Sequence, residues 1–335
     1  MRPRRRVETC SRPSSRPAND GSLSYVILSV VIPAYNASRT IDIALRSVYG
    51  PNISGLWSIE VIVIDDGSTD RDALDRTISR FPQTIVVTHT VNRGMCASRN
   101  SGIQQSHGDV VVILDADDEL VPEWPAVLRS VVDEWPPEAH VCFSACRTPS
   151  GRSTVSDPDY CGFLSEGDLL NERHRGEYLP LFRGPYIRSR RYVDIGTRRS
   201  CGILSYLMFS REAPLWVTPR VLRIYHDESD GSVSQGWATP TKAREAVRCY
   251  GALLERFALA YRQGAPRVYR TKLLRLAVYR HLAGEPDAWG AWWAGATGRT
   301  LPETVATAIL LLLSPDWCSR VVTRVRQLGL IRRYG

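Results

Sequence analysis

Three carboxylates at the end of a continuous apolar run are the residues whose types and spacing first suggest chemistry. The run covers residues 110–114, and Asp115, Asp117 and Asp118 follow it with only Ala116 between them. Carboxylates this close repel one another unless a positive group lies among them. That group could be an arginine or a divalent metal ion, and exposure to solvent is the third alternative. The pattern therefore predicts a buried strand that ends at a charged site.

The segments that must position these carboxylates alternate between strand-like and helical patterns. Short connections between such segments favour a parallel sheet covered by helices on both faces, so we predict an α/β fold. Ligands bind at the carboxyl ends of the strands in such sheets. The expected strands lie at 25–33, 59–65, 84–89 and 109–115, and the expected helices at 38–50, 70–80 and 95–106.

The second half of the sequence predicts a change of architecture. Further strands are expected at 140–148 and 219–226, with an irregular, arginine-rich stretch at 150–200 between them. Helical periodicity dominates from about 238 to 283. We therefore divide the chain into a disordered basic tail at 1–22, an α/β domain at 23–235 and a helical C-terminal region at 236–335.

Composition limits the class of protein. The 335 residues carry 43 Lys and Arg against 35 Asp and Glu, a formal net charge of +8, and only Lys242 and Lys272 are lysines. Arginine suits planar contacts to phosphate and carboxylate. Eight cysteines are scattered without a C-x-x-C pair, which favours reduced thiols in a cytoplasmic protein over a disulfide framework. Every apolar run in the sequence is shorter than the ~20 residues that a membrane span needs.

Common ligand-binding signatures are missing from the sequence. The first strand is not followed by G-x-G-x-x-G, and the chain has no Gly-Lys pair for a phosphate-binding P-loop. An EF-hand loop starting at Asp115 would need Gly at 120 and Glu at 126, where Leu120 and Ala126 stand.

Four other motifs occur in a specific order. They are VVIPAYN at 30–36, VIDDGSTD at 63–70, NRGMCASRNSGI at 92–103 and ILDADDE at 113–119. Together they resemble the motifs of the family 2 glycosyltransferases, well over residues 26–120 and loosely to about 235. The resemblance implies a GT-A fold for residues 23–235, which is a mostly parallel, Rossmann-like sheet covered by helices.

The resemblance also implies a nucleoside-diphosphate sugar as ligand, and no nucleic acid. The segment 33–36 would lie under the base and ribose, and Asp66 would accept a hydrogen bond from the base. Asp115 and Asp117 correspond to the DXD motif of the family. The residues that the resemblance places around the nucleotide sugar are Pro33, Ala34, Tyr35, Asn36, Asp66, Arg93, Arg99, Asp115 and Ala116.

A divalent cation is the next implication of the resemblance. Mn²⁺ or Mg²⁺ would be held by Asp117 and Asp118, because these hard ions prefer carboxylate and phosphate oxygens. His226, near the end of the resembling region, is a further expected ligand. Its alternative role is that of a strand-end histidine bonded to backbone.

The general base cannot be transferred from the family. Inverting members usually carry a Glu-Asp pair in the acceptor half, but this chain has no acidic residue between Asp194 and Glu212. Asp194 is the nearest carboxylate, and the alternatives are Asp227, Glu228 and Asp230.

Two arginines stand almost where the acidic pair is expected. Arg198 and Arg199 could hold an anionic acceptor, such as a lipid phosphate, because guanidinium groups bind phosphate and carboxylate in a bidentate manner. An acceptor that is already ionised needs no protein base. The alternative is that these arginines face solvent.

Two classes of function stay open. The first is a metal-dependent, inverting, hexosyltransferase-like enzyme that builds a cell envelope polysaccharide, a glycolipid or another glycoconjugate. The second is a catalytically silent sugar-nucleotide-binding protein that acts as an interaction module.

The apolar stretch and arginines within 300–335 predict a peripheral contact with the inner face of a membrane, or a helix packed on the α/β domain. Trp289, Trp292 and Trp293 favour helix packing over a membrane belt.

Overall fold

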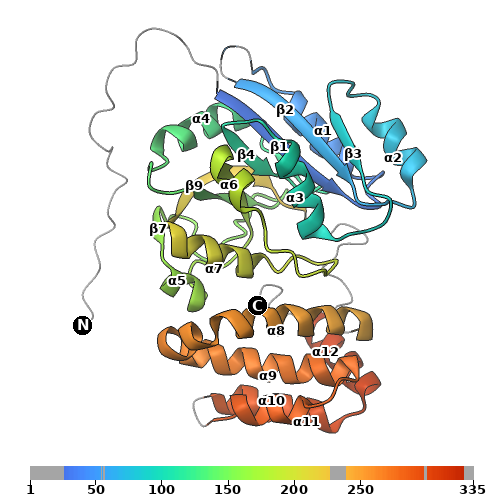
Figure 1. The fold of residues 1–335 in the computed structure, drawn as a ribbon, viewed down its shortest axis with the longest axis vertical. Helices are drawn as coiled ribbons and strands as arrows, with labels where there is room; N and C mark the ends of the chain where they lie inside the picture. The colour runs from blue at the N-terminus through green and yellow to red at the C-terminus, as the bar shows by residue number, and fades with distance from the viewer. Residues whose placement is uncertain (1–25, 54, 56, 227–238, 298–299, 328–335) are drawn as a thin grey trace.

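The computed structural model describes residues 26–53, 55, 57–226, 239–297 and 300–327 (Figure 1). The predicted tail at 1–22 and the alternative bases at 227–230 lie outside these residues. In Figure 1 a sheet with its covering helices occupies the upper part, and a stack of helices occupies the lower part.

A single mixed sheet forms the centre of the upper part. In the described part of the chain it has nine strands, in the order β3-β2-β1-β4-β8-β6-β9-β5, and β7 pairs with β9. The strands are β1 Val26–Ala34, β2 Trp57–Asp65, β3 Ile85–Thr88, β4 Val110–Ile113, β5 Glu119–Leu120, β6 Val141–Arg147, β7 Gly162–Leu164, β8 Tyr178–Arg183 and β9 Leu215–Ile224.

The first four strands of this order, β3, β2, β1 and β4, are parallel. Val30 of β1 pairs with Val61 of β2 on one side and with Val112 of β4 on the other. Beyond β4 the sheet is mixed, because β8 runs antiparallel to both β4 and β6. The predicted α/β fold is confirmed. Its parallel half brings the carboxyl ends of β1, β2 and β4 to one edge.

Helices cover both faces of the sheet, as the alternation of side chains in β1 shows. Leu28, Val30 and Ile32 join the core beneath α1, α2 and α4, whereas Val31 joins the core beneath α3, α6 and α7. The helices of this domain are α1 Ile41–Tyr49, α2 Arg71–Ile78, α3 Met95–Gln105, α4 Trp124–Glu134, α5 Glu166–Leu170, α6 Gly184–Arg190 and α7 Gly202–Glu212.

The helical region packs against α7 and α5. Leu204 and Leu207 of α7 share a buried cluster with Leu253 and Phe257, and the Lys272 ammonium lies 2.8 Å from a Glu172 carboxylate oxygen. The helices of this region are α8 Pro240–Gly264, α9 Pro266–Ala283, α10 Ala288–Gly295, α11 Leu301–Leu312 and α12 Pro315–Gln327. Within the described ranges, none of these helices combines the length and the apolar character that crossing a membrane requires.

Candidate active site

The carboxylates that follow β4 lie at the edge where the parallel strands end. Asp118 N–H donates to the Asp115 carbonyl at 3.1 Å, so the chain turns immediately after the strand. The turn separates the carboxylates by exposure: the Asp115 side chain is 33% exposed and the Asp118 side chain only 1%. Asp117 is half-buried. One carboxylate therefore faces outward from this turn while another is enclosed.

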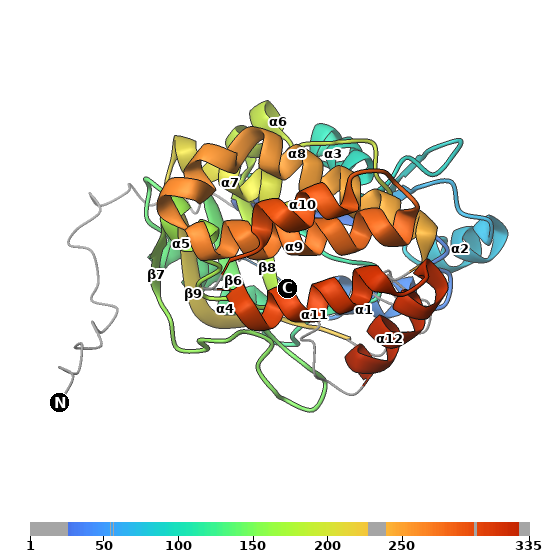
Figure 2. The ribbon, with the colours of Figure 1, turned by 90° about the horizontal axis from the view of Figure 1, so that it is seen from below.

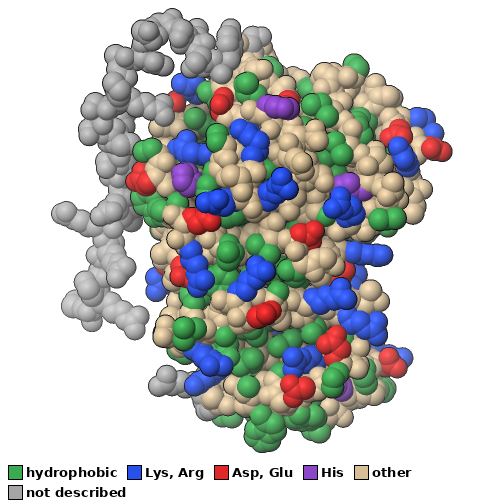
Figure 3. Space-filling model, in the orientation of Figure 1, with side chains coloured by type: hydrophobic (Ala, Val, Ile, Leu, Met, Phe, Trp, Pro, Cys, Tyr) green, Lys and Arg blue, Asp and Glu red, His purple; other side chains and the backbone are tan. Residues whose placement is uncertain are grey.

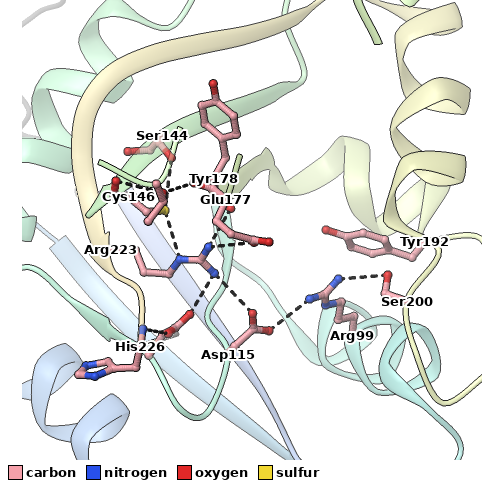
Figure 4. Close-up of polar contacts among 12 residues, drawn as sticks. Arg99, Asp115, Ser144, Cys146, Glu177, Tyr178, Tyr192, Ser200, Arg223 and His226 are labelled. Carbon is pink, nitrogen blue, oxygen red and sulfur yellow. Dashed lines mark hydrogen bonds and ion pairs between the residues drawn. The ribbon is translucent and has the colours of Figure 1, made fainter. Parts of the chain in front are cut away.

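Arg223 of β9 is the positive group that lies among these carboxylates (Figure 4). Its guanidinium lies 3.4 Å from Asp115, 3.2 Å from Asp118 and 3.6 Å from Glu177. The same side chain donates to the Cys146 sulfur at 3.2 Å and to the Tyr178 carbonyl at 3.3 Å, and it is 3% exposed. A buried guanidinium with this many partners fixes the positions of the carboxylates around it.

Arg99 of α3 holds Asp115 from the other side (Figure 4). It lies 3.2 Å from the second Asp115 oxygen, and it also donates to the Ser200 hydroxyl at 3.4 Å. Its guanidinium stands 5.4 Å from the centre of the Tyr192 ring. Asp115 is thus clamped between two arginines that come from distant parts of the chain.

Burial sets the electrostatics of this cluster. Burial raises the pKa of Asp118 above its ordinary range, and this shift is larger than the opposing shift from the charge of Arg223. The negative charges of Asp115 and Asp117 raise the pKa further. Burial also raises the pKa of Glu177, where Arg223 opposes the shift and Asp115 adds to it. With its raised pKa, Glu177 accepts a proton more readily than an ordinary glutamate does.

Asp66 connects the end of β2 to the start of α3. Its carboxylate accepts the backbone N–H groups of Arg93 at 2.9 Å and Gly94 at 2.8 Å, and it lies 2.6 Å from His89 Nδ1. Gly94 has φ +96°, and a Cβ there would lie 2.2 Å from the Thr197 carbonyl oxygen. Asp66 is 4% exposed, and its contacts hold the loop that leads into α3 in place. A hydrogen bond to a nucleotide base remains a proposal.

These three contacts predict a large effect on stability. Asp66→Ala should lower the free energy of unfolding by about 2–5 kcal/mol, because two backbone N–H groups and a histidine lose a buried charged acceptor. Chemical denaturation followed by tryptophan fluorescence measures this change. Asp66→Asn is the matched control, since it keeps one acceptor oxygen and should lose less. An alanine variant as stable as the wild type would contradict the role in holding the loop.

The segment 33–36 borders the same edge. Ala34 is 2% exposed, and its carbonyl accepts Asp66 N–H at 2.8 Å. Asn36 adopts φ 52° and accepts Thr69 N–H at 2.8 Å, which ties the segment to the turn after β2. Tyr35 is 43% exposed. Its ring is the part of this segment that is free of the core and accessible to a base.

The expected metal ligands are only partly brought together. His226 N–H donates to Asp118 at 2.9 Å, but its Nε2 lies 3.0 Å from Glu119, and Figure 4 shows the ring pointing away from Asp115. Across the described ranges no group of three or more His, Cys, Asp or Glu side chains is arranged to hold a metal ion. Mg²⁺ is commonly bound through one or two carboxylates together with substrate phosphates. Asp115 and Asp117 fit that smaller set of ligands.

The expected acceptor residues lie at the rim of the edge. Arg198 is exposed, its N–H donates to Glu245 at 3.1 Å, and its carbonyl accepts Met95 N–H at 3.0 Å. Arg199 is half-buried, and burial lowers its pKa while Glu245 opposes the shift. Asp194 is exposed, and its carboxylate accepts Gly196 N–H at 2.9 Å.

Two residues of this site were not found by reasoning from the sequence. Arg223 lies within β9, and Glu177 directly precedes β8. Both strands belong to the second half of the sheet, which the four sequence motifs do not cover. The only signal for Arg223 is a charged residue inside the apolar run VLRIY, and Glu177 carries no signal at all. Tertiary pairing of β6 with both β8 and β9 is what brings them to the DXD turn.

A half-parallel sheet with helices on both faces and an acidic turn at the end of β4 defines the class: a GT-A type domain. Residues 29–184 match the sequence model of the Glycosyl transferase family 2, and the chain therefore carries a family 2 glycosyltransferase domain. The predicted family is confirmed.

Several known proteins are similar to this chain. A Campylobacter jejuni GalNAc(5)-diNAcBac-PP-undecaprenol beta-1,3-glucosyltransferase is 24% identical over 249 residues, which cover 68% of this chain and 72% of that protein. An uncharacterized glycosyltransferase of Haemophilus influenzae is 34% identical over 110 residues, 33% of this chain and 36% of that protein. A Pseudomonas aeruginosa undecaprenyl-phosphate 4-deoxy-4-formamido-L-arabinose transferase is 36% identical over 100 residues, 29% and 30% of the two chains. The match thus spans about a third of the length of the latter two relatives.

A likeness to a solved structure supports the fold. The crystal structure of S. aureus TarS 1-349 in complex with UDP-GlcNAc superposes with a TM-score of 0.53 at 15% identity, and it covers 90% of this chain and 92% of that one. At this identity the likeness shows a shared fold, which extends into the helical region of the present chain.

Proposed function

We propose that this chain is a glycosyltransferase that moves a sugar from a nucleoside-diphosphate sugar to an acceptor. The observation that supports the proposal best is the DXD turn of a family 2 domain, held at a sheet edge by the buried Arg223 and the partly buried Arg99. A carboxylate set that is fixed before the ligand arrives avoids reorganisation during the reaction. Tyr35 and the segment 33–36 lie at the same edge for the nucleotide.

A divalent cation belongs to the proposal. Asp115 and Asp117 would hold Mn²⁺ or Mg²⁺ together with the diphosphate, and the ion would neutralise charge on the leaving group. Asp118 and His226 are committed to Arg223 and Glu119, so their role as ligands would require those contacts to open. Because Asp115 is paired with Arg99 and Arg223, the cation must compete with two guanidinium groups for it.

This competition predicts that metal and nucleotide bind together. Isothermal titration with UDP should show binding in the presence of Mn²⁺ and at least about tenfold weaker binding in EDTA, because two carboxylates alone do not make a strong site. Mn²⁺ titrated without nucleotide should give little heat. Equal affinity for UDP in Mn²⁺ and in EDTA would remove the metal from the proposal, while GDP and ADP serve as controls for the choice of base.

The reaction requires a proton acceptor when the acceptor group is a hydroxyl. The acceptor oxygen forms a bond to the anomeric carbon, the bond from that carbon to the diphosphate oxygen breaks, and the hydroxyl proton passes to a base. Attack from the face opposite the leaving group inverts the anomeric carbon. Asp194 is one proposed base, and Glu177 is a second that the structure adds, because it flanks Arg223 and Asp115 and has a raised pKa.

We further propose a lipid-linked acceptor. Two of the similar proteins are named for undecaprenyl-bearing substrates, and both belong to bacteria. A phosphate near the acceptor group would suit Arg198 and Arg199 at the rim, although Glu245 reduces their positive potential. The same proposal includes a peripheral contact of residues 300–335 with a membrane. It also includes a role in the synthesis of cell envelope polysaccharide.

A silent sugar-nucleotide-binding protein is the second candidate function. The observation that favours it is the absence of any acidic residue from 195 to 211, where relatives usually carry the base. Incubation of the full chain with UDP- and GDP-sugars and Mn²⁺ separates the two. Slow release of UDP or GDP without acceptor indicates an enzyme, whereas binding without any release indicates the silent protein.

A further inference from the structure

Large apolar side chains are exposed on the three consecutive helices α10, α11 and α12. Figure 1 shows α10 and α11 at the end of the molecule farthest from the sheet, and α12 at the level of α8 and α9. Trp293 is 71% exposed, Leu312 75% and Trp317 59%, and these residues belong to α10, α11 and α12. The other members of the set are Trp289, Leu301, Val305 and Ile309. We call these seven residues the apolar end face. Figure 3 shows hydrophobic side chains gathered at this lower end.

The apolar end face is continuous along α11. Leu301, Val305, Ile309 and Leu312 follow the spacing of one side of a helix, and every exposed residue of α11 is apolar. Its single acidic residue, Glu303, is partly covered and lies 3.6 Å from Arg267. The opposite side of α11 packs inward through Leu311, which shares a buried cluster with Leu273 and Leu276 of α9. In the described part of the chain, the outward side of α11 is thus exposed.

The neighbouring helix α10 extends the face. Its sequence, AWGAWWAG, has no charged residue, and Trp292 fastens it to α11 through a hydrogen bond from its indole N–H to the Thr304 carbonyl at 3.1 Å. Trp289 and Trp293 remain exposed. Of the three tryptophans, Trp292 packs against the buried cluster of Leu273 and Leu276 of α9. Figure 1 shows α10 and α11 below α9, and in Figure 2 the two helices lie on either side of α9.

The charge of the chain is concentrated in the same region. Residues 236–335 contain 16 Lys and Arg against 6 Asp and Glu, a net charge of +10, whereas residues 1–235 carry a net −2. Exposed Arg320 and Arg324 lie one turn apart on α12, and the Arg320 guanidinium stands 5.3 Å from the Trp317 ring centre. Large apolar area with exposed arginines beside Trp317 is suited to an anionic surface with an apolar interior.

From these contacts we infer that the apolar end face binds the surface of an anionic lipid bilayer. Leu301, Ile309 and Leu312 would enter the boundary between headgroups and acyl chains, and the exposed tryptophans would lie at headgroup level, where their amphipathic rings are favoured. Arg320 and Arg324 would meet the lipid phosphates. The contact lies on the surface, because no described helix is able to span the bilayer.

A second copy of the chain is the other occupant that an apolar face could have. Pairing two end faces would bring two regions of net +10 against each other, and this repulsion opposes a symmetric dimer. An anionic bilayer is attracted by the same charge. The charge therefore favours lipid over a second copy.

The test is flotation of the full chain with vesicles. With vesicles that contain phosphatidylglycerol, we expect the wild type to float at low salt and to float less at high salt. Leu312→Ser and Trp293→Ser should each lower the partition coefficient at least about fivefold. Leu259→Ser is the matched control, because Leu259 is 68% exposed on α8, outside the face, and should bind like the wild type. No sugar nucleotide is present, so the result is independent of the proposed activity.

Three outcomes would overturn the inference. The first is a wild type that stays unbound with anionic vesicles at low salt. The second is a Leu312→Ser variant that binds as strongly as the wild type. In the third, light scattering shows a dimer of the wild type that Leu312→Ser converts to a monomer, which would assign the face to a second copy. Circular dichroism of each variant checks that the helices are retained.

Discussion

Asp117→Ala is expected to reduce sugar transfer by at least about a hundredfold while leaving the unfolding temperature unchanged. Asp117 sits in the DXD turn, half-buried, and its charge raises the pKa of the enclosed Asp118. Removing that charge relieves repulsion among the three carboxylates when no ligand is bound. The same removal takes away a carboxylate that the proposed diphosphate site needs. Sugar transfer should therefore fall while the unfolding temperature stays the same.

Asp115→Ala is the contrasting variant. It should also abolish transfer, but it should lower the free energy of unfolding by about 1–3 kcal/mol, because the buried Arg223 and the partly buried Arg99 each lose a charged partner. Arg223 keeps its contacts with Asp118 and Glu177, and Arg99 keeps its hydrogen bond to Ser200. These remaining contacts limit the loss of stability.

Transfer of radiolabelled sugar and thermal unfolding of the two variants measure these effects. Glu119→Gln serves as a control from the same turn, since Glu119 pairs with His226 outside the Asp115 network. An Asp117→Ala variant with near wild-type transfer would exclude that carboxylate from the site. An Asp115→Ala variant of unchanged stability would show that the two arginines find other partners.

The parallel half of the sheet could be predicted from the sequence because its signals are local. The expected strands from 25 to 115 are short β-branched runs, a helical segment follows each of the first three, and the structure has β1 to β4 at these places. Parallel order then places Asp66 and Asp115 at one edge without knowledge of any contact.

The second half could not be predicted in the same way. The stretch 150–200 was expected to be irregular, yet it contains β7, α5, β8 and α6. β8 lies at the centre of the sheet because it pairs with both β4 and β6. At the pairs Val112↔Leu181 and Phe143↔Pro180 the partners are 69 (181 − 112) and 37 (180 − 143) residues apart in the sequence. Pairing at that range leaves no local pattern, particularly in a strand with a proline at Pro180.

The role of Asp66 shows a different limit. The motif places it at the strand end correctly, but the sequence does not say what its oxygens bind. The structure shows that they are taken by Arg93 N–H, Gly94 N–H and His89. Likewise, the positive group among the carboxylates after β4 was expected to be a metal, and the structure supplies Arg223 and Arg99. Both answers depend on side chains that only the tertiary fold brings together.

Glu177→Gln is expected to lower kcat by about 10²–10⁴-fold with little change in nucleotide affinity, if Glu177 is the base. Glutamine keeps the size of the side chain and one acceptor oxygen for Arg223, which also retains Asp115 and Asp118. The fold should therefore persist. Burial and Asp115 raise the pKa of Glu177, so the wild-type rate should fall with decreasing pH already above the ordinary range of a glutamate. The glutamine variant should lack this acidic limb.

Asp194→Asn is the matched variant at the competing carboxylate. Asp194 is exposed and accepts a local N–H from Gly196, so its neutral analogue should keep the loop and nearly all of the activity. If Asp194→Asn abolishes transfer and Glu177→Gln does not, Asp194 is the base. If neither variant loses activity, while Arg198→Ala and Arg199→Ala raise the acceptor KM strongly, the acceptor is already ionised and needs no base. The pH profile separates this case as well, because the acidic limb would then follow the acceptor and be the same in the wild type and in Glu177→Gln.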